Sequence, residues 1–572
     1  MSRRTRAAAA LLAGLCLVTA ACSGGGNGAD VASSAPSPTA VGSGPADPTR
    51  PNLLVIETDD MRADELVWMP RTSRLLGAKG LQFLNSFSPN PLCCPARASF
   101  LTGKYSHNHR VLSHEPPYGF GAFDDSVTLA TRLADAGYST ALIGKYLNGY
   151  GVQPTLAGED SSGYVPPGWT QWWAGLDNKR GRTGGTYDYF HLTANVNGEQ
   201  VSWPGRYSTD LTAEQTGEVV DAFAQDPDRP WFVWWNPVAP HHGAPIEDDD
   251  PGTVKRSDGF GVDWATPARP DEVRGRFDDE IVKGAGVPVT GSPEADVSDK
   301  PRYLRLLPEL SDTERDVLRT VTRQRAEALS VLDDRIAETF AHLKKIGEAD
   351  DTVVVFTSDN GYYLGEHRKR QGKINLHEPS IRVPLLIRGP GVPQGTRFDP
   401  VTTLDLSATL AAYAGVELPG ADGTDLRPLI AQGDRGWSRA VVIEGRMPEA
   451  GYESAADSEP GWDGLGTVGV RLGRWKVVRY ATGEREVYDL DRDPLELENL
   501  AAGPDTALLA RLDHVWDEYV DCAGAGCRRE LPEQLRLDPA ENERITRQQD
   551  LAEREAFGGP GRLASGPPTL AP

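Results

Sequence analysis

The stretch Asn52-Leu53-Leu54-Val55-Ile56-Glu57-Thr58, which runs directly into Asp59-Asp60, decides the fold. Its nearly continuous apolar residues are typical of a strand buried on both faces, in a parallel sheet that lies between helices. Three more apolar runs predict strands further along the chain, at 139–144, 231–235 and 352–358. Helical stretches at about 127–136 and 311–346 separate these predicted strands. We therefore predict an α/β fold with a doubly wound, mostly parallel sheet flanked by helices.

Each of these four strands is followed by polar side chains. In an open α/β sheet the ligand site lies beyond the carboxyl ends of the strands, so residues far apart in sequence meet there. Each residue alone has a simpler explanation, because Asp-Asp and Asp-Asn-Gly are common in turns and Gly-Lys usually marks a solvated lysine. Their joint occurrence at strand ends predicts one shared site, formed by Asp59, Asp60, Lys145, His241, Asp359 and Asn360.

A second segment, Pro91-Leu92-Cys93-Cys94-Pro95-Ala96-Arg97, continues as Ala98-Ser99-Phe100-Leu101-Thr102-Gly103 and supplies a candidate nucleophile. Pro95 suits the first turn of a helix, where an N–H would be unpaired anyway, so Cys93 and Cys94 are expected at a helix N-terminus. Free amide groups and the helix dipole favour an anion there, and Arg97 adds a cation one turn further on. An ordinary buried helix start with two small apolar thiols is the simpler alternative.

This segment resembles the signature of the sulfatase family at every position, with C-x-P-x-R followed by a short apolar run and Thr-Gly. The residues from Gly137 to Leu147 are similar to the second signature of that family. The resemblance implies an alkaline phosphatase-like fold with a smaller C-terminal α+β domain. It also implies that Cys93 is oxidised to formylglycine (3-oxoalanine) by a formylglycine-generating enzyme, because Cys94 lacks a proline two residues on.

The acidic residues of the expected site form a hard, oxygen-only ligand set. Carboxylate and amide oxygens suit calcium or magnesium better than zinc, which prefers nitrogen and sulfur. The resemblance implies a calcium ion, and we expect Ca²⁺ in preference to Mg²⁺. Its charge would offset the sulfate ester and the deprotonated nucleophile. The implied ligands are Asp59, Asp60, Asp359, Asn360 and an oxygen of the modified Cys93.

The catalytic roles also follow from the resemblance. It implies that the hydrate on Cys93 attacks sulfur while Asp359 assists its deprotonation. A second hydroxyl on the same carbon then releases sulfate and regenerates the aldehyde, a step that plain cysteine or serine could not provide. The residues implied to contact the sulfate or the departing alcohol are Lys145, His241 and Lys373, with Arg97 as the signature arginine.

The chain departs from the family pattern at one position. Many members carry a histidine two residues after the signature lysine, but here that residue is Leu147, followed by Asn148. The identity of the base that helps to expel sulfate is therefore open. His107 and His109 are nearby candidates, although either could simply cap the helix that Cys93 begins, and His242 is a weaker candidate than His241.

The substrate class is expected from a narrower resemblance. The runs 92–97, 104–109 and 145–148 are most similar to N-acetylglucosamine-6-sulfatase-like members. We therefore expect a sulfuric ester hydrolase that acts on a small-molecule or carbohydrate sulfate, such as an aryl or glycosaminoglycan sulfate. A phosphonate or phosphate ester hydrolase of the same superfamily is one alternative, and a catalytically silent glycan-binding lipoprotein is another. The net charge of -23 argues against nucleic acid as a partner.

The start of the chain is typical of an export signal, with three arginines before an apolar run too short to span a bilayer. Thr19-Ala20-Ala21-Cys22 resembles a bacterial lipobox. We expect 1–22 to be a lipoprotein-type signal peptide, with Cys22 lipidated as the only membrane attachment, on the outer face of the cell membrane. Plain cleavage and secretion is the alternative. Residues 23–50 are expected to form a flexible Gly/Ser/Pro linker.

The remainder of the chain is expected to form three parts. These are a catalytic domain at 51–430, a small C-terminal domain at 431–530, and a polar helix with a disordered tail at 531–572. Within the last part, 541–555 is predicted to be a solvated helix. Cys522 and Cys527 are five residues apart in a chain that is expected to be exported, which predicts a small disulfide loop.

Overall fold

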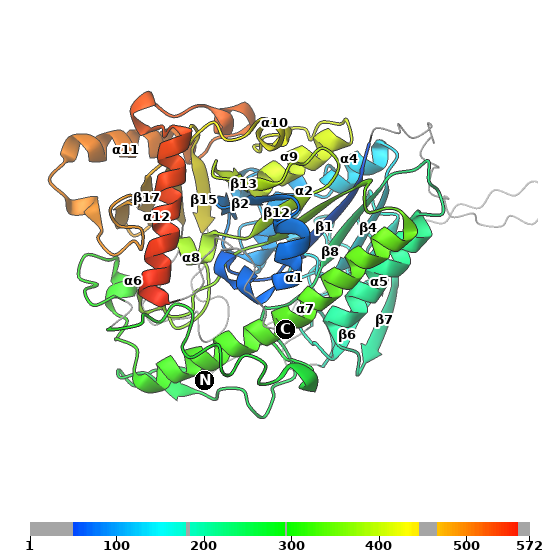
Figure 1. The fold of residues 1–572 in the computed structure, drawn as a ribbon, viewed down its shortest axis with the longest axis horizontal. Helices are drawn as coiled ribbons and strands as arrows, with labels where there is room; N and C mark the ends of the chain where they lie inside the picture. The colour runs from blue at the N-terminus through cyan, green and yellow to red at the C-terminus, as the bar shows by residue number, and fades with distance from the viewer. Residues whose placement is uncertain (1–49, 179–182, 292–293, 446–465, 559–572) are drawn as a thin grey trace, which may run out of the picture. The chain divides into compact units, whose positions relative to one another are not determined.

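The computed structural model describes residues 50–178, 183–291, 294–445 and 466–558 (Figure 1). The expected signal segment with Cys22, the linker up to residue 49 and the last residues of the tail lie outside this part of the chain. Within the described residues, no helix is both long and apolar enough to cross a membrane.

The strand β1 (Asn52–Thr58) lies in the middle of a sheet that has ten strands among the described residues. It pairs in parallel with β11 (Thr352–Ser358) on one side and with β8 (Trp231–Asn236) on the other. Beyond β8, β4 (Ser139–Gly144) and β5 (Gln171–Gly175) continue the parallel part. The four strands predicted from sequence are therefore neighbours whose carboxyl ends lie at one edge.

The outer strands of this sheet include antiparallel pairs. β12 pairs antiparallel with β11 and β2, β13 pairs parallel with β2, and β6 pairs antiparallel with β5 and β7. The sheet is thus mostly parallel at its centre and mixed at both sides. The bounds of these strands are β2 (Leu81–Phe83), β12 (Leu385–Arg388), β13 (Gly395–Arg397), β6 (His191–Val196) and β7 (Glu199–Pro204).

Helices cover both faces of the sheet. Alternate residues of β1 point to opposite faces, and each set packs against its own group of helices. Leu53 and Val55 belong to one apolar cluster, which includes α2, α4 and α9. Leu54 and Ile56 belong to another, which includes α5 and α7, and these two helices run side by side (Figure 1). The predicted doubly wound α/β fold is confirmed. The bounds are α2 (Cys93–Thr102), α4 (Leu129–Asp135), α9 (Thr403–Tyr413), α5 (Ser208–Phe223) and α7 (Asp312–Ile346).

A second, antiparallel sheet follows near the C-terminus, in the strand order β15-β16-β17-β18. Its apolar residues share one buried cluster with α11 and with Phe87, Leu92 and Tyr105 from the first part of the chain. The two sheets are therefore joined by a common core. The bounds are β15 (Val441–Gly445), β16 (Thr467–Leu472), β17 (Trp475–Arg479), β18 (Arg485–Asp489) and α11 (Thr506–Tyr519).

The short elements connect and edge these layers. Two pairs of short strands lie outside the two large sheets: β3 (Ser86–Phe87) with β14 (Val401–Thr402), and β9 (Val254–Lys255) with β10 (Gly261–Val262). The short helices are α1 (Pro70–Thr72), α3 (Ser106–His109), α6 (Arg302–Arg305), α8 (Glu378–Ile381) and α10 (Arg427–Gln432).

The expected solvated helix is α12 (Pro539–Phe557), but it is not solvated on all sides. Five of its residues are buried, and most of them are polar. Asn542 Nδ2 donates a hydrogen bond of 2.8 Å to the carbonyl of Phe398, and Asn85 Nδ2 donates one of 2.8 Å to Thr546 Oγ1. The prediction was wrong about exposure because hydrogen bonds, not an apolar stripe, attach this helix to residues 85 and 398.

Candidate active site

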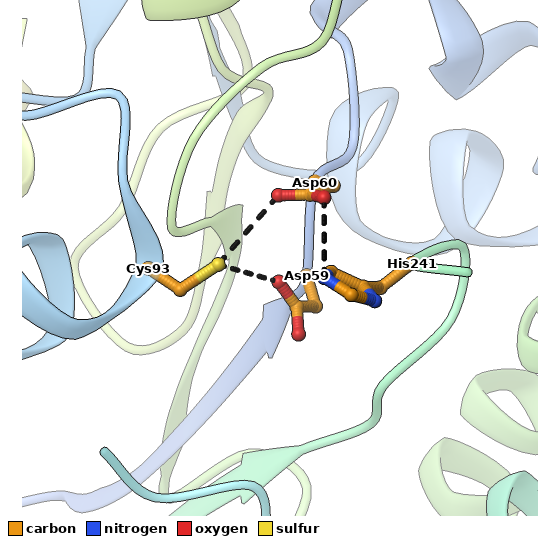
Figure 2. Close-up of side chains that lie close together, drawn as sticks. All are labelled: Asp59, Asp60, Cys93 and His241. Carbon is orange, nitrogen blue, oxygen red and sulfur yellow. Dashed lines mark hydrogen bonds and ion pairs between the residues drawn. The ribbon is translucent and has the colours of Figure 1, made fainter. Parts of the chain in front are cut away.

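The strand ends bring the predicted site residues together. β1 is followed by Asp59 and Asp60, and its neighbour β11 by Asp359 and Asn360. Lys145 directly follows β4, His241 lies in the loop after β8, Cys93 is the first residue of α2, and Lys373 comes from the loop after β11. All eight of these side chains are buried. Figure 2 shows Asp59, Asp60, Cys93 and His241 pointing toward one another.

Cys93 is surrounded by charged groups at short range. Its Sγ lies 3.2 Å from Asp59 Oδ1 and 3.7 Å from Asp60 Oδ1 (Figure 2). Lys373 Nζ lies 2.7 Å from the same sulfur and 2.6 Å from Asp60 Oδ1. Lys145 Nζ is 2.5 Å from Asp59 Oδ2. Each aspartate therefore holds one lysine beside the cysteine.

Asp359 is oriented by Arg97 and by two backbone amides. Arg97 Nε donates to Asp359 Oδ2 at 2.8 Å, and the amides of Asp60 and Asn360 donate to Oδ1 at 3.1 and 2.8 Å. Asp60 has a φ of 64°, a left-handed conformation that is uncommon outside glycine and costs about 1–3 kcal/mol. In this conformation the Asp60 amide donates to Asp359, so the strained backbone helps to orient a site carboxylate.

Burial and neighbouring charges set the protonation states. Burial raises the pKa of the Cys93 thiol, and the nearby Asp359 and Asp59 raise it further, so the unmodified thiol stays protonated. Burial opposes the charged form of Asp59, but Lys145, Arg97 and Lys373 lower its pKa to about 2. Burial lowers the pKa of His241, as do His242 and the two lysines, so its imidazole is neutral.

The tautomer of His241 follows from its partner. Its Nδ1 lies 2.6 Å from the carbonyl oxygen of His242, which can only accept, so Nδ1 carries the proton. Nε2 then has a lone pair, and it lies 3.5 Å from Asp60 Oδ2. This nitrogen can accept a proton or bind a cation.

The donor set fits a divalent cation. Ligand atoms of Asp59, Asp60, Cys93 and His241 all lie within 4.8 Å of one another. Within the described residues, Asn360 Oδ1 is a buried acceptor without a hydrogen-bond partner, while Asn360 Nδ2 donates to Asp60 Oδ1 at 2.6 Å. Carboxylate and amide oxygens suit a hard cation, and the imidazole adds one nitrogen. Of the predicted ligands, Asp359 lies beside this group, with both its oxygens accepting from Arg97 and the backbone.

The two histidines considered as bases make contacts elsewhere. His109 Nε2 lies 2.9 Å from Ser99 Oγ, and its Nδ1 accepts from the Val111 amide at 3.1 Å. Burial lowers the pKa of His109 to about 3, so it stays neutral. The His107 ring contacts Glu444 at 2.7 Å and the carbonyl of Cys522 at 2.6 Å. These contacts give both rings structural roles.

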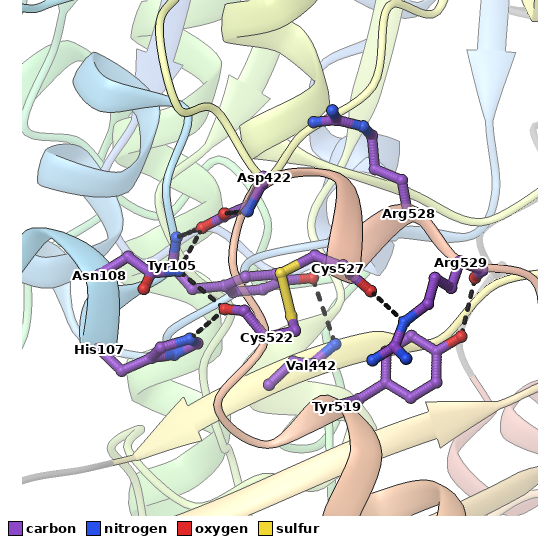
Figure 3. Close-up of a disulfide and its surroundings, with 12 residues drawn as sticks. Tyr105, His107, Asn108, Asp422, Val442, Tyr519, Cys522, Cys527, Arg528 and Arg529 are labelled. Carbon is purple, nitrogen blue, oxygen red and sulfur yellow. Dashed lines mark hydrogen bonds between the residues drawn. A yellow bond between two sulfur atoms is a disulfide. The ribbon is translucent and has the colours of Figure 1, made fainter.

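The predicted disulfide is present between Cys522 and Cys527. Its loop lies against α3, as Figure 3 shows: Asn108 Nδ2 and the ring of His107 contact the Cys522 carbonyl. Asp422 connects the two segments, because Oδ2 accepts from the Tyr105 amide at 2.7 Å and Oδ1 from the Gly524 amide at 2.6 Å. The disulfide loop is thus tied to the segment that follows the Cys93 helix.

Two residues near the site were not identified as functional from the sequence. The Tyr187 ring lies 4.4 Å from the His241 ring, and Asn148 Nδ2 donates to the Tyr187 hydroxyl at 2.7 Å. Tyr187 lies in the aromatic run Tyr187-Asp188-Tyr189-Phe190, which is the only sequence signal for it.

A nucleophile position ringed by carboxylates and lysines at the carboxyl edge of such a sheet defines a class, the ester hydrolases of alkaline phosphatase-like fold. The sequence model described as Sulfatase matches residues 51–416, and the chain belongs to this family. It is accordingly a sulfuric ester hydrolase. A second match, described as N-sulphoglucosamine sulphohydrolase, C-terminal, covers residues 365–515.

Individual relatives agree with this assignment. The chain is 29% identical over 513 residues to an arylsulfatase of Volvox carteri, covering 84% of this chain and 76% of that protein. It is 27% identical over 522 residues to N-acetylglucosamine-6-sulfatase of Homo sapiens, covering 84% and 86%. A solved structure in complex with D-glucosamine-2-N,6-O-disulfate has a TM-score of 0.58 at 21% identity, covering 82% and 98%, and shows the shared fold.

Proposed function

We propose that this protein is an exported, calcium-dependent sulfatase that uses formylglycine at position 93 to hydrolyse carbohydrate or aryl sulfate monoesters. The observation that carries the proposal is the surroundings of Cys93, with two aspartates and Lys373 in contact with its sulfur. A raised pKa keeps the unmodified thiol neutral and therefore a poor nucleophile. When present, the modified residue supplies a geminal diol as nucleophile, and calcium supplies positive charge beside the sulfate.

The side chains of this site are suited to binding an anionic ester. Lys145 and Lys373 present two ammonium groups, held by Asp59 and Asp60, on which sulfuryl oxygens can form charge-assisted hydrogen bonds. The same cations stabilise negative charge that develops on these oxygens and on the departing alcohol. Because the site is buried, these interactions are stronger than they would be in water.

Proton transfer is assigned to two groups of the site, His241 and Asp359. His241 Nε2 carries a lone pair in this structure, so the imidazole would take a proton from solvent water before donating it to the leaving oxygen. Asp359 is held as a fixed acceptor by Arg97 and two backbone amides, and we assign it to deprotonation of the nucleophile. Leu147 packs in the apolar core and has no role in proton transfer.

The substrate assignment rests on the relatives. Both arylsulfatase and N-acetylglucosamine-6-sulfatase align over 84% of this chain, which supports a ring-bearing sulfate ester as substrate.

Export is supported by the disulfide, since such bonds persist in oxidising compartments. We extend the proposal to lipidation of Cys22. A Cys22→Ala variant would then move from the membrane fraction to the medium, whereas unchanged membrane attachment contradicts the anchor.

The test is multiple-turnover sulfate release by protein exported from a host with the maturation enzyme. Mass spectrometry of the Cys93 peptide should show the mass of formylglycine, and Cys93→Ala and Cys93→Ser should lose turnover. Cys94→Ser is the matched control and should remain active. An unmodified thiol in active protein, or turnover by Cys93→Ser, would contradict the proposal. An aryl phosphonate assayed in parallel tests the alternative, which a higher kcat/KM on the phosphorus ester would favour.

A further inference from the structure

Tyr187 is placed next to two of the proposed sulfate-binding groups. Its ring centroid lies 4.4 Å from that of His241, with 32° between the planes. Lys145 Nζ lies 5.1 Å from the same Tyr187 centroid, within the range of a cation–π interaction. Lys145 and His241 are almost fully buried, whereas Tyr187 is half-buried. The ring of Tyr187 therefore contacts two groups that are themselves shielded from solvent.

The Tyr187 ring is held by Asn148, the residue after Leu147, where the chain departs from the family pattern. Leu147 belongs to the apolar core, and the next residue, Asn148, donates through Nδ2 to the Tyr187 hydroxyl at 2.7 Å. Asn148 is itself buried and lies beside the nucleophile helix, because its backbone carbonyl is 3.6 Å from Cys94 Sγ. Asn148 thus connects the lysine segment, the cysteine helix and the aromatic ring.

We propose that Tyr187 is a positioning residue for Lys145 and His241, and that Asn148 holds its ring in place. A lysine side chain has many rotamers, and the two carboxylates near Lys145, Asp59 at 2.5 Å and Asp359 at 3.7 Å, attract its charge without fixing one rotamer. The aromatic face adds a directional contact to its ammonium group, and the tilted Tyr187 ring packs on the His241 imidazole, whose other neighbour is the stacked His242 ring. This inference rests on the proposed function, in which these two groups contact the sulfuryl oxygens.

The contact with two proposed sulfate-binding groups predicts an effect on both catalysis and sulfate affinity. A misplacement of about 1 Å in an active site can cost up to about a hundredfold in rate. Tyr187→Leu removes the ring and should lower kcat by about 30-fold. It should also weaken the binding of inorganic sulfate, measured as product inhibition, by about fivefold. A residue that only supports the fold would lower the amount of active enzyme without changing the inhibition constant of sulfate.

The hydroxyl is tested separately from the ring. Tyr187→Phe keeps the ring but loses the bond to Asn148, and Asn148→Ala loses the same bond from the other side. Each should lower kcat by about three- to fivefold, and the double variant should be no worse than either one, because both remove a single interaction. Tyr164→Phe is the matched control, since its hydroxyl contacts Asp125 in another part of the molecule. It should stay within about twofold of the wild type.

The outcomes separate this inference from the proposed function. If Tyr187→Leu keeps wild-type kcat and sulfate inhibition, or if the losses of Tyr187→Phe and Asn148→Ala multiply, the positioning role is overturned. If the wild type releases no sulfate at all, the proposed function fails. Calorimetric titration of inorganic sulfate into wild type and Tyr187→Leu then decides the inference: weaker binding by the variant supports it, and equal or absent binding overturns it.

Discussion

Replacing Arg97 should destabilise the protein far more than replacing an exposed arginine. Its guanidinium is fully buried, donates to Asp359 at 2.8 Å and lies 4.0 Å from Glu57. Arg97→Met leaves both carboxylates buried, with Lys145 Nζ still 3.7 Å from Asp359 Oδ2. Removing one partner of a buried ion pair costs about 3–5 kcal/mol. We expect a loss of this size in the free energy of unfolding, together with loss of turnover.

Urea unfolding followed by tryptophan fluorescence measures this loss, with Arg71→Met as the matched control. The Arg71 side chain is 56% exposed in its pair with Asp334, so that change should cost less than about 1 kcal/mol. Burial raises the pKa of Glu57 to about 7, and adding Glu57→Gln to Arg97→Met should recover about 1–2 kcal/mol. Equal losses for Arg97→Met and Arg71→Met would refute the reasoning.

Three further predictions concern the metal, the disulfide and acid stability. EDTA should abolish sulfate release by the matured enzyme and added Ca²⁺ should restore it; activity that survives chelation contradicts a metal requirement. Cys522→Ser with Cys527→Ser should lower stability by about 2 kcal/mol through loop entropy, in a thermal melt compared with the wild type under non-reducing conditions; an unchanged melting temperature opposes this. Against the effect of burial, His377, Tyr480 and Tyr488 lower the pKa of Glu486 to about 2 from 4.5. Its contribution to stability is present above about pH 4.5 and lost as the pH falls toward 2, so Glu486→Gln should flatten acid unfolding over that interval; an unchanged slope contradicts the assignment.

Much of the fold could be predicted from local sequence. The run 52–58 is apolar throughout because both of its faces are buried, and this property identifies a central parallel strand without any tertiary information. The helix predicted at 311–346 is also present, with a capping box of Ser311 and Glu314 at its start and Gly347 after its end at a φ of 88°. The solvated-helix prediction failed for α12, because polar residues can be buried through hydrogen bonds that sequence periodicity does not record.

The candidate site was predictable in its members but not in its contacts. Strand ends and one helix start identified Asp59, Lys145 and Cys93, which the structure brings together. The sequence did not show that His107 contacts the disulfide loop, or that Tyr187 lies on His241. Both contacts join segments far apart in the chain, and the aromatic run at 187–190 does not show which ring the Tyr187 side chain meets.

By itself, the sequence determined the four central parallel strands and the residue types available for chemistry, because a continuous apolar run is a local pattern. The tertiary structure alone decided which lysine each aspartate holds, which tautomer His241 adopts and which ring covers Lys145. These depend on distances of a few ångströms between loops, and such distances are set by the packing of the whole core.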